Sequence, residues 1–335
     1  MAKIHTGFDI GGNMLKIAVC SDAQVKQLVA EPLPDSLVKD GRIVSSEAMS
    51  EFLKETAKRR RVTGKDCAVV IPASQVFIRR ITMPLMTVDQ LKLNLPYEFR
   101  DYITREKDKY FYDYSVIRIK EPDQEDPQGE MELLAVATEK STIDEYREMF
   151  RRAGFRMKIA APQECAFTNL LQRLPVVLDE AGRAKDYCIV DAGHDATRVH
   201  IYSAGAFEVS KIIDYGGFTV DSLISEIYSV DEHVARTYKE SNYKNVLDEV
   251  RCANLFSTIA VEIMKTINFY GFNNPVNNLD SIYMSGGGSR MKGLLQNIEN
   301  FTGFTLRSVE ELLPPVEEGA GDGILAAAAV GIALG

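Results

Sequence analysis

Two segments of this 335-residue chain carry nearly the same pattern. Residues 7–19 read GFDIGGNMLKIAV, and residues 189–201 read IVDAGHDATRVHI. Each predicts an apolar strand, a turn that begins Asp-x-Gly and a second apolar strand, which together form a hairpin with a carboxylate at its tip. A carboxylate beside glycine backbone can hold a phosphate through a bound metal ion. Because the pattern occurs twice, the sequence predicts two similar half-molecules that close on one nucleotide.

Length and charge narrow the class of protein further. A chain of 335 residues exceeds one compact core, so we expect at least two domains. The net charge of −9 argues against a nucleic-acid partner and against direct docking to an anionic membrane. The five cysteines and four histidines form no metal-ligand spacing, which favours a reducing compartment and no zinc site. The chain also lacks an apolar run of about 20 residues, so we expect a cytoplasmic protein without direct membrane insertion.

The two hairpin turns supply the expected phosphate and metal site. Asp9 and Asp191 would hold Mg²⁺ through its water shell, because this ion keeps much of its hydration. Lys16, on the returning strand of the first hairpin, could contact a phosphate as a point charge. The other phosphate-site candidates are the turn residues Gly11, Gly12, Asn13, Met14, Gly193 and His194. An ordinary Asp-Gly hairpin turn explains either motif alone, whereas the matching pair favours nucleotide binding.

A third motif lies about 90 residues after the second hairpin and reads SGGGSRMKGL at 285–294. It predicts a strand, a turn of three glycines and a helix, so that backbone can lie flat against a planar base. The residues that we assign to nucleotide binding here are Gly286, Gly287, Gly288 and Arg290. Such a turn is often a plain connection between a strand and a helix. It supports nucleotide binding here because of its position after the second hairpin.

The three motifs in this order resemble the superfamily of actin, the Hsp70 chaperones and the sugar kinases. The hairpins resemble its two phosphate loops, and the glycine turn resembles its adenosine loop. The resemblance implies an α/β fold with duplicated ribonuclease-H-like (actin/Hsp70-type) domains around a nucleotide cleft, with ATP and Mg²⁺ as cofactors. It further implies that Gly216 and Gly217 lie close to the nucleotide and that Glu262 and Lys265 contact its ribose and base.

An insertion separates the branches of this superfamily. Here it lies between the first sheet and the first connecting helix, where FtsA-like proteins carry subdomain 1C, and the segment that begins IRRITMP at residue 78 is similar to the PilM family of type IV pilus assembly proteins. The resemblance divides the chain into subdomain 1A at 1–73 and 159–185, the α+β insertion 1C at 74–158, subdomain 2A at 186–230 and 278–335, and subdomain 2B at 231–277.

Hydrolysis is less certain than binding from these residues. Gln163 and Glu164 stand at the start of the first connecting helix, and either could position the water that attacks the γ-phosphate. Gly12 and Asn13 stand where relatives often carry a hydroxyl group, so one ligand of the phosphate is lost. We therefore expect ATP binding with at most slow hydrolysis.

Resemblance to the PilM family implies a nucleotide-dependent scaffold. It would dock the short cytoplasmic tail of a single-pass PilN-like partner in a groove between subdomain 1C and the first sheet, with residues 77–103 as the place to look. The protein would then be peripheral to the inner membrane through that partner. The alternatives are an FtsA-like protein that self-associates into filaments and, with less support, a sugar- or acetate-type kinase. A kinase should show a second catalytic Asp in a substrate loop, and we find no clear candidate.

Overall fold

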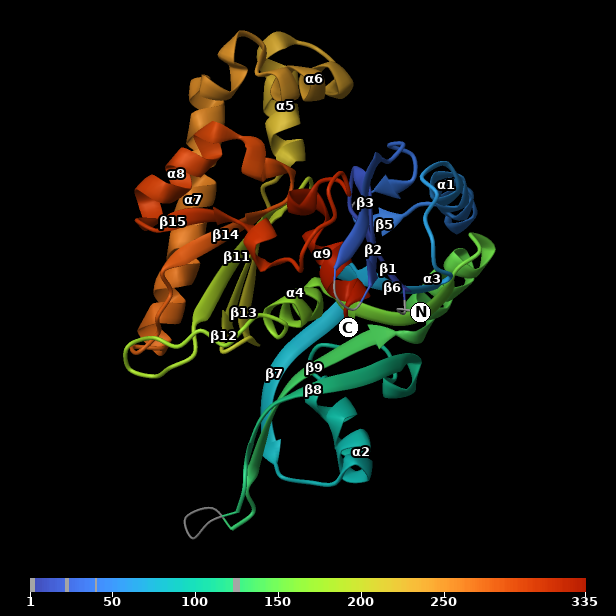
Figure 1. Cartoon of the computed structure of the whole chain (residues 1–335), viewed down its shortest axis with the longest axis vertical. Coiled ribbons are helices and arrows are strands. Elements are labelled where there is room, and N and C mark those ends of the chain that lie inside the picture. Colours follow the sequence, from blue (N-terminus) through green and yellow to red (C-terminus); the bar gives the residue numbers. More distant parts are fainter. Residues whose placement is uncertain (1–3, 22–23, 40, 123–126) are drawn as a thin grey trace.

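The chain consists of two α/β lobes and a smaller α+β unit in a computed structural model that describes residues 4–21, 24–39, 41–122 and 127–335 (Figure 1). The strands of the first lobe are β1 (Ile4–Ile10), β2 (Met14–Ser21), β3 (Val25–Pro32), β6 (Asp66–Ile71) and β10 (Arg156–Pro162), with the short pair β4 (Val38–Lys39) and β5 (Arg42–Ile43). The main sheet has the order β10-β6-β1-β2-β3. Its helices are α1 (Ser46–Arg59), α3 (Lys140–Arg152) and α4 (Gln163–Leu171).

The second lobe repeats this topology. Its strands are β11 (Asp186–Ala192), β12 (Thr197–Ser203), β13 (Ala206–Ile213), β14 (Ser281–Ser285) and β15 (Thr305–Ser308), and its helices are α5 (Gly217–Tyr228), α6 (Glu232–Ser241), α7 (Val250–Asn273), α8 (Lys292–Thr302) and α9 (Gly323–Ala333). The order of its sheet is β13-β12-β11-β14-β15. In both sheets the first strand of the lobe lies in the centre, with the second and third strands on one side of it and the fourth and fifth on the other. This confirms the duplicated fold that the repeated sequence pattern predicts.

Helices α4 and α9 fill the space between the two sheets. The alanine-rich α9 is buried along almost its whole length, and glycines allow its backbone to approach its neighbours closely. A side-chain carbon on Gly7 of β1 would lie 1.9 Å from the carbonyl oxygen of Ala329, and one on Gly331 would lie 2.1 Å from that of Ala166 in α4. The C-terminal helix therefore joins the two lobes into one packed core.

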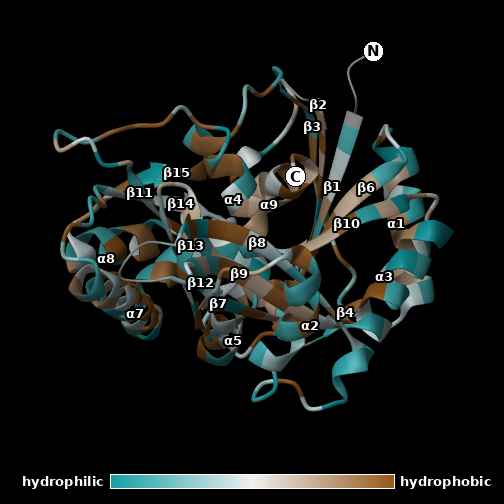
Figure 2. Cartoon of the chain, turned by 90° about the horizontal axis from the view of Figure 1, so that it is seen from below, coloured by the Kyte–Doolittle hydropathy of each residue, from teal (hydrophilic) through white to brown (hydrophobic). Residues whose placement is uncertain are grey.

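The opposite face of the first sheet is covered by α1 and α3, which lie side by side next to β6 and β10 (Figure 2). Phe150 of α3 packs edge-on against Phe8 of β1, with ring centroids 4.9 Å apart. Since α3 belongs to this core, it is part of the first lobe. The insertion that the sequence assigns to 74–158 is therefore shorter, and its sheet and helix lie within residues 76–139.

The inserted unit is a three-stranded antiparallel sheet with one helix. Its strands are β7 (Val76–Pro84), β8 (Tyr110–Lys120) and β9 (Glu130–Glu139) in the order β7-β9-β8, and its helix is α2 (Val88–Glu98). Consecutive residues of β9 point to opposite faces, so that Leu133 packs among the residues of α2 and Leu134 joins the central core with α4 and α9. The unit is thus fixed to the first connecting helix.

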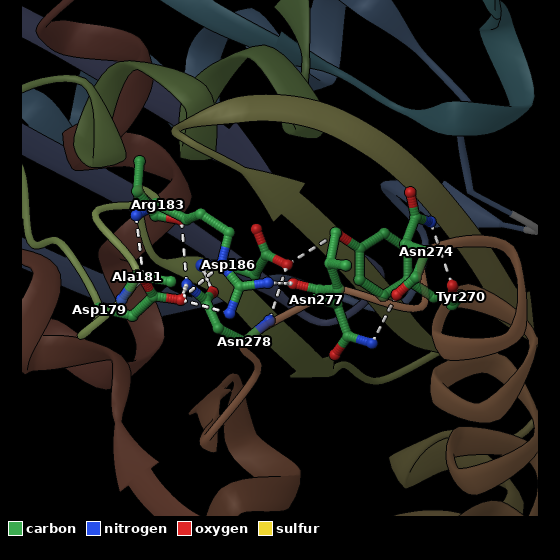
Figure 3. A network of polar contacts seen from close by, with 10 residues as sticks. Asp179, Ala181, Arg183, Asp186, Tyr270, Asn274, Asn277 and Asn278 are labelled. Atoms are coloured by element: carbon green, nitrogen blue, oxygen red, sulfur yellow. Dashed lines mark hydrogen bonds and ion pairs between the residues drawn. The ribbon is translucent and has the colours of Figure 1, made fainter.

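Helix α7 belongs to the core of the second lobe. Its buried residues Phe256, Ile263 and Ile267 pack with Met284 of β14, so the predicted subdomain 2B at 231–277 includes a helix that is part of 2A. At the far end of α7, the Tyr270 hydroxyl donates a 2.9 Å hydrogen bond to Asp186 at the start of β11 (Figure 3). Helix α7 therefore runs along the sheet to the end where β11 begins.

Candidate functional site

A cavity of about 1040 Å³ lies between the two lobes and receives both hairpin turns. The predicted site residues that line it are Asp9, Gly11, Gly12, Asn13, Met14, Lys16, Gln163, Glu164, Asp191, Gly193, His194, Gly217, Gly286, Gly287, Gly288 and Arg290. The turns face each other closely, because a side-chain carbon on Gly12 would lie 2.3 Å from a carboxylate oxygen of Asp195. Motifs that are far apart in the sequence thus form one site.

On the first lobe, the acidic residue of the turn is paired with a cation. Asp9 on β1 lies directly opposite Lys16 on β2, and the Lys16 ammonium lies 3.1 Å from the Asp9 carboxylate. Burial of Lys16 disfavours its charge, but the carboxylates of Asp9 and Asp191 outweigh this effect and raise the pKa of the ammonium. Lys16 is therefore charged and close to both acidic tips.

On the second lobe, the equivalent cation is Arg198, which sequence reasoning missed. Asp191 on β11 lies directly opposite Arg198 on β12, and Arg198 lines the cavity. The signal was available in the repeat, because Arg198 has the same spacing from Asp191 as Lys16 has from Asp9. Unlike Asp9, Asp191 accepts a 2.7 Å hydrogen bond from the Gln163 side-chain amide at the start of α4.

The two candidates at the start of α4 have different surroundings. Gln163 contacts Asp191 and also lies with its Oε1 3.2 Å from Nε2 of the buried His200. Glu164 touches the cavity wall, but its buried carboxylate accepts a 3.1 Å hydrogen bond from Ser210 on β13. Consecutive residues of a helix point about 100° apart, so only one of them can face Asp191. Gln163 is the better candidate for contact with a phosphate.

The glycine turn after β14 packs against the second hairpin. Gly286 has a φ of +82°, and a side-chain carbon there would lie 2.6 Å from the Asp191 carboxylate and from the carbonyl oxygen of Ala192. In contrast, a side-chain carbon on Gly287 would meet nothing within 4 Å. Gly286 is therefore required by the backbone, whereas Gly287 leaves open space in the cavity wall.

Gly216 does not line the cavity in the described part of the chain but lies directly behind the second turn. A side-chain carbon on it would lie 2.3 Å from the carbonyl oxygen of His194. The next residue, Gly217, donates a 2.9 Å hydrogen bond from its backbone N–H to Gly193. Burial, followed by the charges of nearby cations, lowers the pKa of His194 to about 4, so this cavity residue is neutral near pH 7.

The placement of Glu262 and Lys265 corrects the expectation that they contact ribose and base. They lie on α7 outside the cavity lining of the described chain, where the Lys265 ammonium lies 2.6 Å from the Glu262 carboxylate. The physical reason is that α7 runs toward the start of β11, whereas Asp191 lies near the end of that strand. A lysine and a glutamate do reach the cavity from α6, as Lys239 and Glu240.

Lys239 is held in place by a buried carboxylate. Its ammonium lies 2.7 Å from Asp221 of α5 and donates a 3.0 Å hydrogen bond to the carbonyl oxygen of Gly217. Asp221 is fully buried. This arrangement ties α6 to the turn that begins α5.

The donor set fits a hydrated Mg²⁺ better than a metal held entirely by side chains. Among the described residues, no three or more His, Cys, Asp and Glu side chains gather as a metal site. Asp9 and Asp191 do face the same cavity, with the Lys16 charge near both. Two carboxylates and a bound phosphate are typical ligands of Mg²⁺, which retains several waters.

The duplicated sheets and the shared cavity define an actin-like protein. A model of the family described as type IV pilus assembly protein PilM matches residues 7–313. The chain therefore belongs to the PilM family, as the sequence predicts. Within the described residues, no helix combines the length and apolar character needed to cross a membrane.

Two solved structures show the same fold. A chain of a structure titled "PilM-PilN type IV pilus biogenesis complex" has a TM-score of 0.82 at 20% identity, covering 98% of this chain and 97% of that one. The ethanolamine utilization protein EutJ from Carboxydothermus hydrogenoformans has a TM-score of 0.61 at 15% identity, covering 99% and 89%. A search of curated proteins finds no match. The family match does not favour the filament or kinase alternatives.

Proposed function

We propose that this chain is an ATP-binding scaffold of the type IV pilus inner-membrane assembly complex. It works in the cytoplasm and is held at the membrane by the cytoplasmic tail of a single-pass PilN-like protein. The observation that carries the nucleotide part is the single cavity into which the Asp9 and Asp191 turns both open. The family match over residues 7–313 supports the assembly role.

In this proposal, Mg²⁺-ATP lies between the lobes. Its phosphates lie at the two hairpin turns beside Lys16, and Asp9 and Asp191 hold the metal ion through its waters. The nucleoside lies toward the glycine turn at 286–288 and toward Lys239 of α6. Bound ATP would supply an anion that both lobes contact, which favours the closed arrangement of the lobes.

The surroundings of Gln163 favour nucleotide binding over rapid hydrolysis. Its amide nitrogen donates to Asp191, and its amide oxygen lies 3.2 Å from His200 Nε2. Burial lowers the pKa of His200, so this ring is neutral and can donate from Nε2. A side chain held at both ends is not free to orient an attacking water. We infer a switch that responds to occupancy, with slow turnover at most.

The partner site in this proposal is the groove between subdomain 1C and the first sheet. Strand β10 is at an edge of that sheet, and Ile159 on it is 37% exposed. Within residues 77–103, α2 also exposes Leu93 and Tyr97 one turn apart. A short peptide can add to a free strand edge while its side chains enter neighbouring pockets. The similar solved chain comes from a complex of PilM with PilN.

A titration tests this proposal. A fluorescent peptide with the cytoplasmic N-terminal sequence of the PilN-type protein from the same organism should bind the full chain saturably. Ile159→Lys should weaken binding about tenfold or more, because it places a charge at the strand edge. The matched control Val276→Lys, at a position 68% exposed in the second lobe, should bind like the parent. Absence of saturable binding to the parent would reject the docking proposal.

A further inference from the structure

Arg198 is a cation of the cavity wall that has no counter-ion among the described residues. It lies on β12, half-buried, and lines the cavity between the lobes. Within the described residues, its guanidinium takes part in no hydrogen bond or ion pair. The guanidinium lies against the second turn, because a side-chain carbon on Gly193 would be 3.8 Å from its Nη1. An unpaired guanidinium beside a glycine turn is a natural site for an anion.

The absence of an ion pair is informative, because a carboxylate is available. Asp191 is directly opposite Arg198 in an antiparallel pair, where the Cβ atoms are about 5 Å apart. In the first hairpin, the same register brings Lys16 into contact with Asp9. In the second, Asp191 instead accepts the amide of Gln163. Within the part of the chain that the structure describes, Arg198 therefore pairs with no carboxylate and is available to an anion from outside the chain.

Arg198 and Lys16 approach each other from opposite lobes. Both side chains line the cavity, and the positive charge of Arg198 is close enough to Lys16 to oppose the rise in the pKa of the Lys16 ammonium. Gln163, where α4 begins, lines the same cavity. Two converging cations repel each other unless an anion lies between them.

We propose that Arg198 binds the terminal phosphoryl group of a nucleoside triphosphate and makes the cavity select triphosphate over diphosphate. This inference rests on the nucleotide site proposed above. A planar guanidinium can donate two parallel hydrogen bonds to phosphate oxygens, which a lysine ammonium cannot reproduce. A diphosphate would leave the Arg198 charge unpaired in a half-buried position. Arg198 is thus the residue through which the second lobe senses the state of the nucleotide.

Calorimetric titration of the full chain with Mg²⁺-ADP and with a non-hydrolysable Mg²⁺-ATP analogue tests this assignment. The parent should bind the analogue about tenfold more tightly than ADP. Arg198→Ala should weaken analogue binding by about tenfold to a hundredfold and ADP binding by less than about threefold. Arg198→Lys keeps the charge without the planar group, so its affinity for the analogue should lie between those of the parent and Arg198→Ala. Arg307→Ala, at a surface ion pair with Glu311, is the control that should change neither.

Two results would overturn the inference, and they are distinct. An equal loss of ADP and analogue binding in Arg198→Ala would show that Arg198 does not read the terminal phosphoryl group. A parent that binds neither nucleotide would reject the proposed nucleotide site and this inference with it. Circular dichroism melting checks that each variant is folded. If Arg198→Ala does not fold, Arg198→Lys and Arg198→Gln provide the same ratio of ADP to analogue affinity.

Discussion

The two lobes share a strand order and a hairpin register, yet their acidic tips have different partners. Asp9 and Lys16 face each other in the first lobe, as Asp191 and Arg198 do in the second. Only the first pair forms an ion pair, whereas in the second the Asp191 carboxylate accepts a hydrogen bond from Gln163 of α4. A duplicated scaffold thus becomes asymmetric through one connecting helix. The two lobes therefore contribute different sets of contacts to one cavity: an Asp9–Lys16 ion pair from the first, and an Asp191–Gln163 hydrogen bond beside Arg198 from the second.

The insertions of the two lobes also differ in position. Subdomain 1C lies between the fourth and fifth strands of the first sheet, counted from the hairpin, whereas α5, α6 and α7 lie between the third and fourth strands of the second. In the second lobe, α6 brings Lys239 to the cavity. In the first, the insertion packs on α4 and presents Arg80 to Glu208 of β13. One insertion therefore contributes to the wall of the cavity between the lobes, and the other connects the two lobes outside it.

The largest expected effect comes from removing either acidic tip. Asp9→Asn and Asp191→Asn should each weaken Mg²⁺-ATP binding about a hundredfold, because each removes one carboxylate from the metal ion. Calorimetry with and without Mg²⁺ measures the change. Glu262→Gln, at a partly exposed ion pair outside the cavity, should bind as the parent does. If one of the two tip variants kept full affinity, a single lobe would suffice for the metal.

The glycine turn gives the next largest effect, on stability. Gly286→Ala should lower the free energy of unfolding by about 2–3 kcal/mol, because its backbone conformation is essentially restricted to glycine and a side chain would meet Asp191 and Ala192. Gly287→Ala, the adjacent control with open space, should change it by less than about 0.5 kcal/mol. Urea unfolding measures both. Equal effects would mean that Gly286 is not confined by the second hairpin.

The turns also differ in how they respond to pH, because the second carries His194 where the first has Gly12. The pKa of His194 falls from 6.5 to about 4, through burial first and then nearby cations. The folded state favours the neutral ring, whereas the unfolded chain takes up a proton near pH 6.5. The contribution of His194 to the free energy of unfolding is therefore full above about pH 6.5 and is lost as the pH falls toward 4. His194→Gln should reduce the loss of stability over this range by about 2 kcal/mol. Parallel pH profiles for parent and variant would contradict this.

The smallest expected effect concerns the contact between the insertion and the second lobe. Arg80 pairs with Glu132 of β9 and with Glu208 of β13, and all three side chains are largely buried. Arg80→Met should lower the free energy of unfolding by about 1 kcal/mol, because it leaves Glu208 without its cation and Glu132 with only the more exposed Arg118 at 3.6 Å. Arg118→Met, whose side chain is 72% exposed, is the matched control and should have almost no effect. Similar urea midpoints for both variants would exclude a role for the Arg80 contact.

The sequence predicts the local features of the site well, because each depends on a short pattern. The hairpin turns and the glycine turn are local, and their repetition predicted that they meet. Which group pairs with Asp191 depends instead on where α4 begins relative to β11, so Arg198 could not be recognised as unpaired. Glu262 and Lys265 were misplaced because the direction of α7 depends on long-range packing. The boundary of subdomain 1C was missed for the same reason, since α3 is fixed by contacts with Phe8.

The central claim is that both lobes hold one Mg²⁺-nucleotide. A crystal structure of the chain with Mg²⁺ and a non-hydrolysable ATP analogue tests it most directly. We predict one nucleotide per chain, with its phosphates between the turns at 11–13 and 193–195 and with Arg198 on the terminal phosphoryl group. A nucleotide that contacts only one lobe, or that binds outside this cavity, would contradict the account.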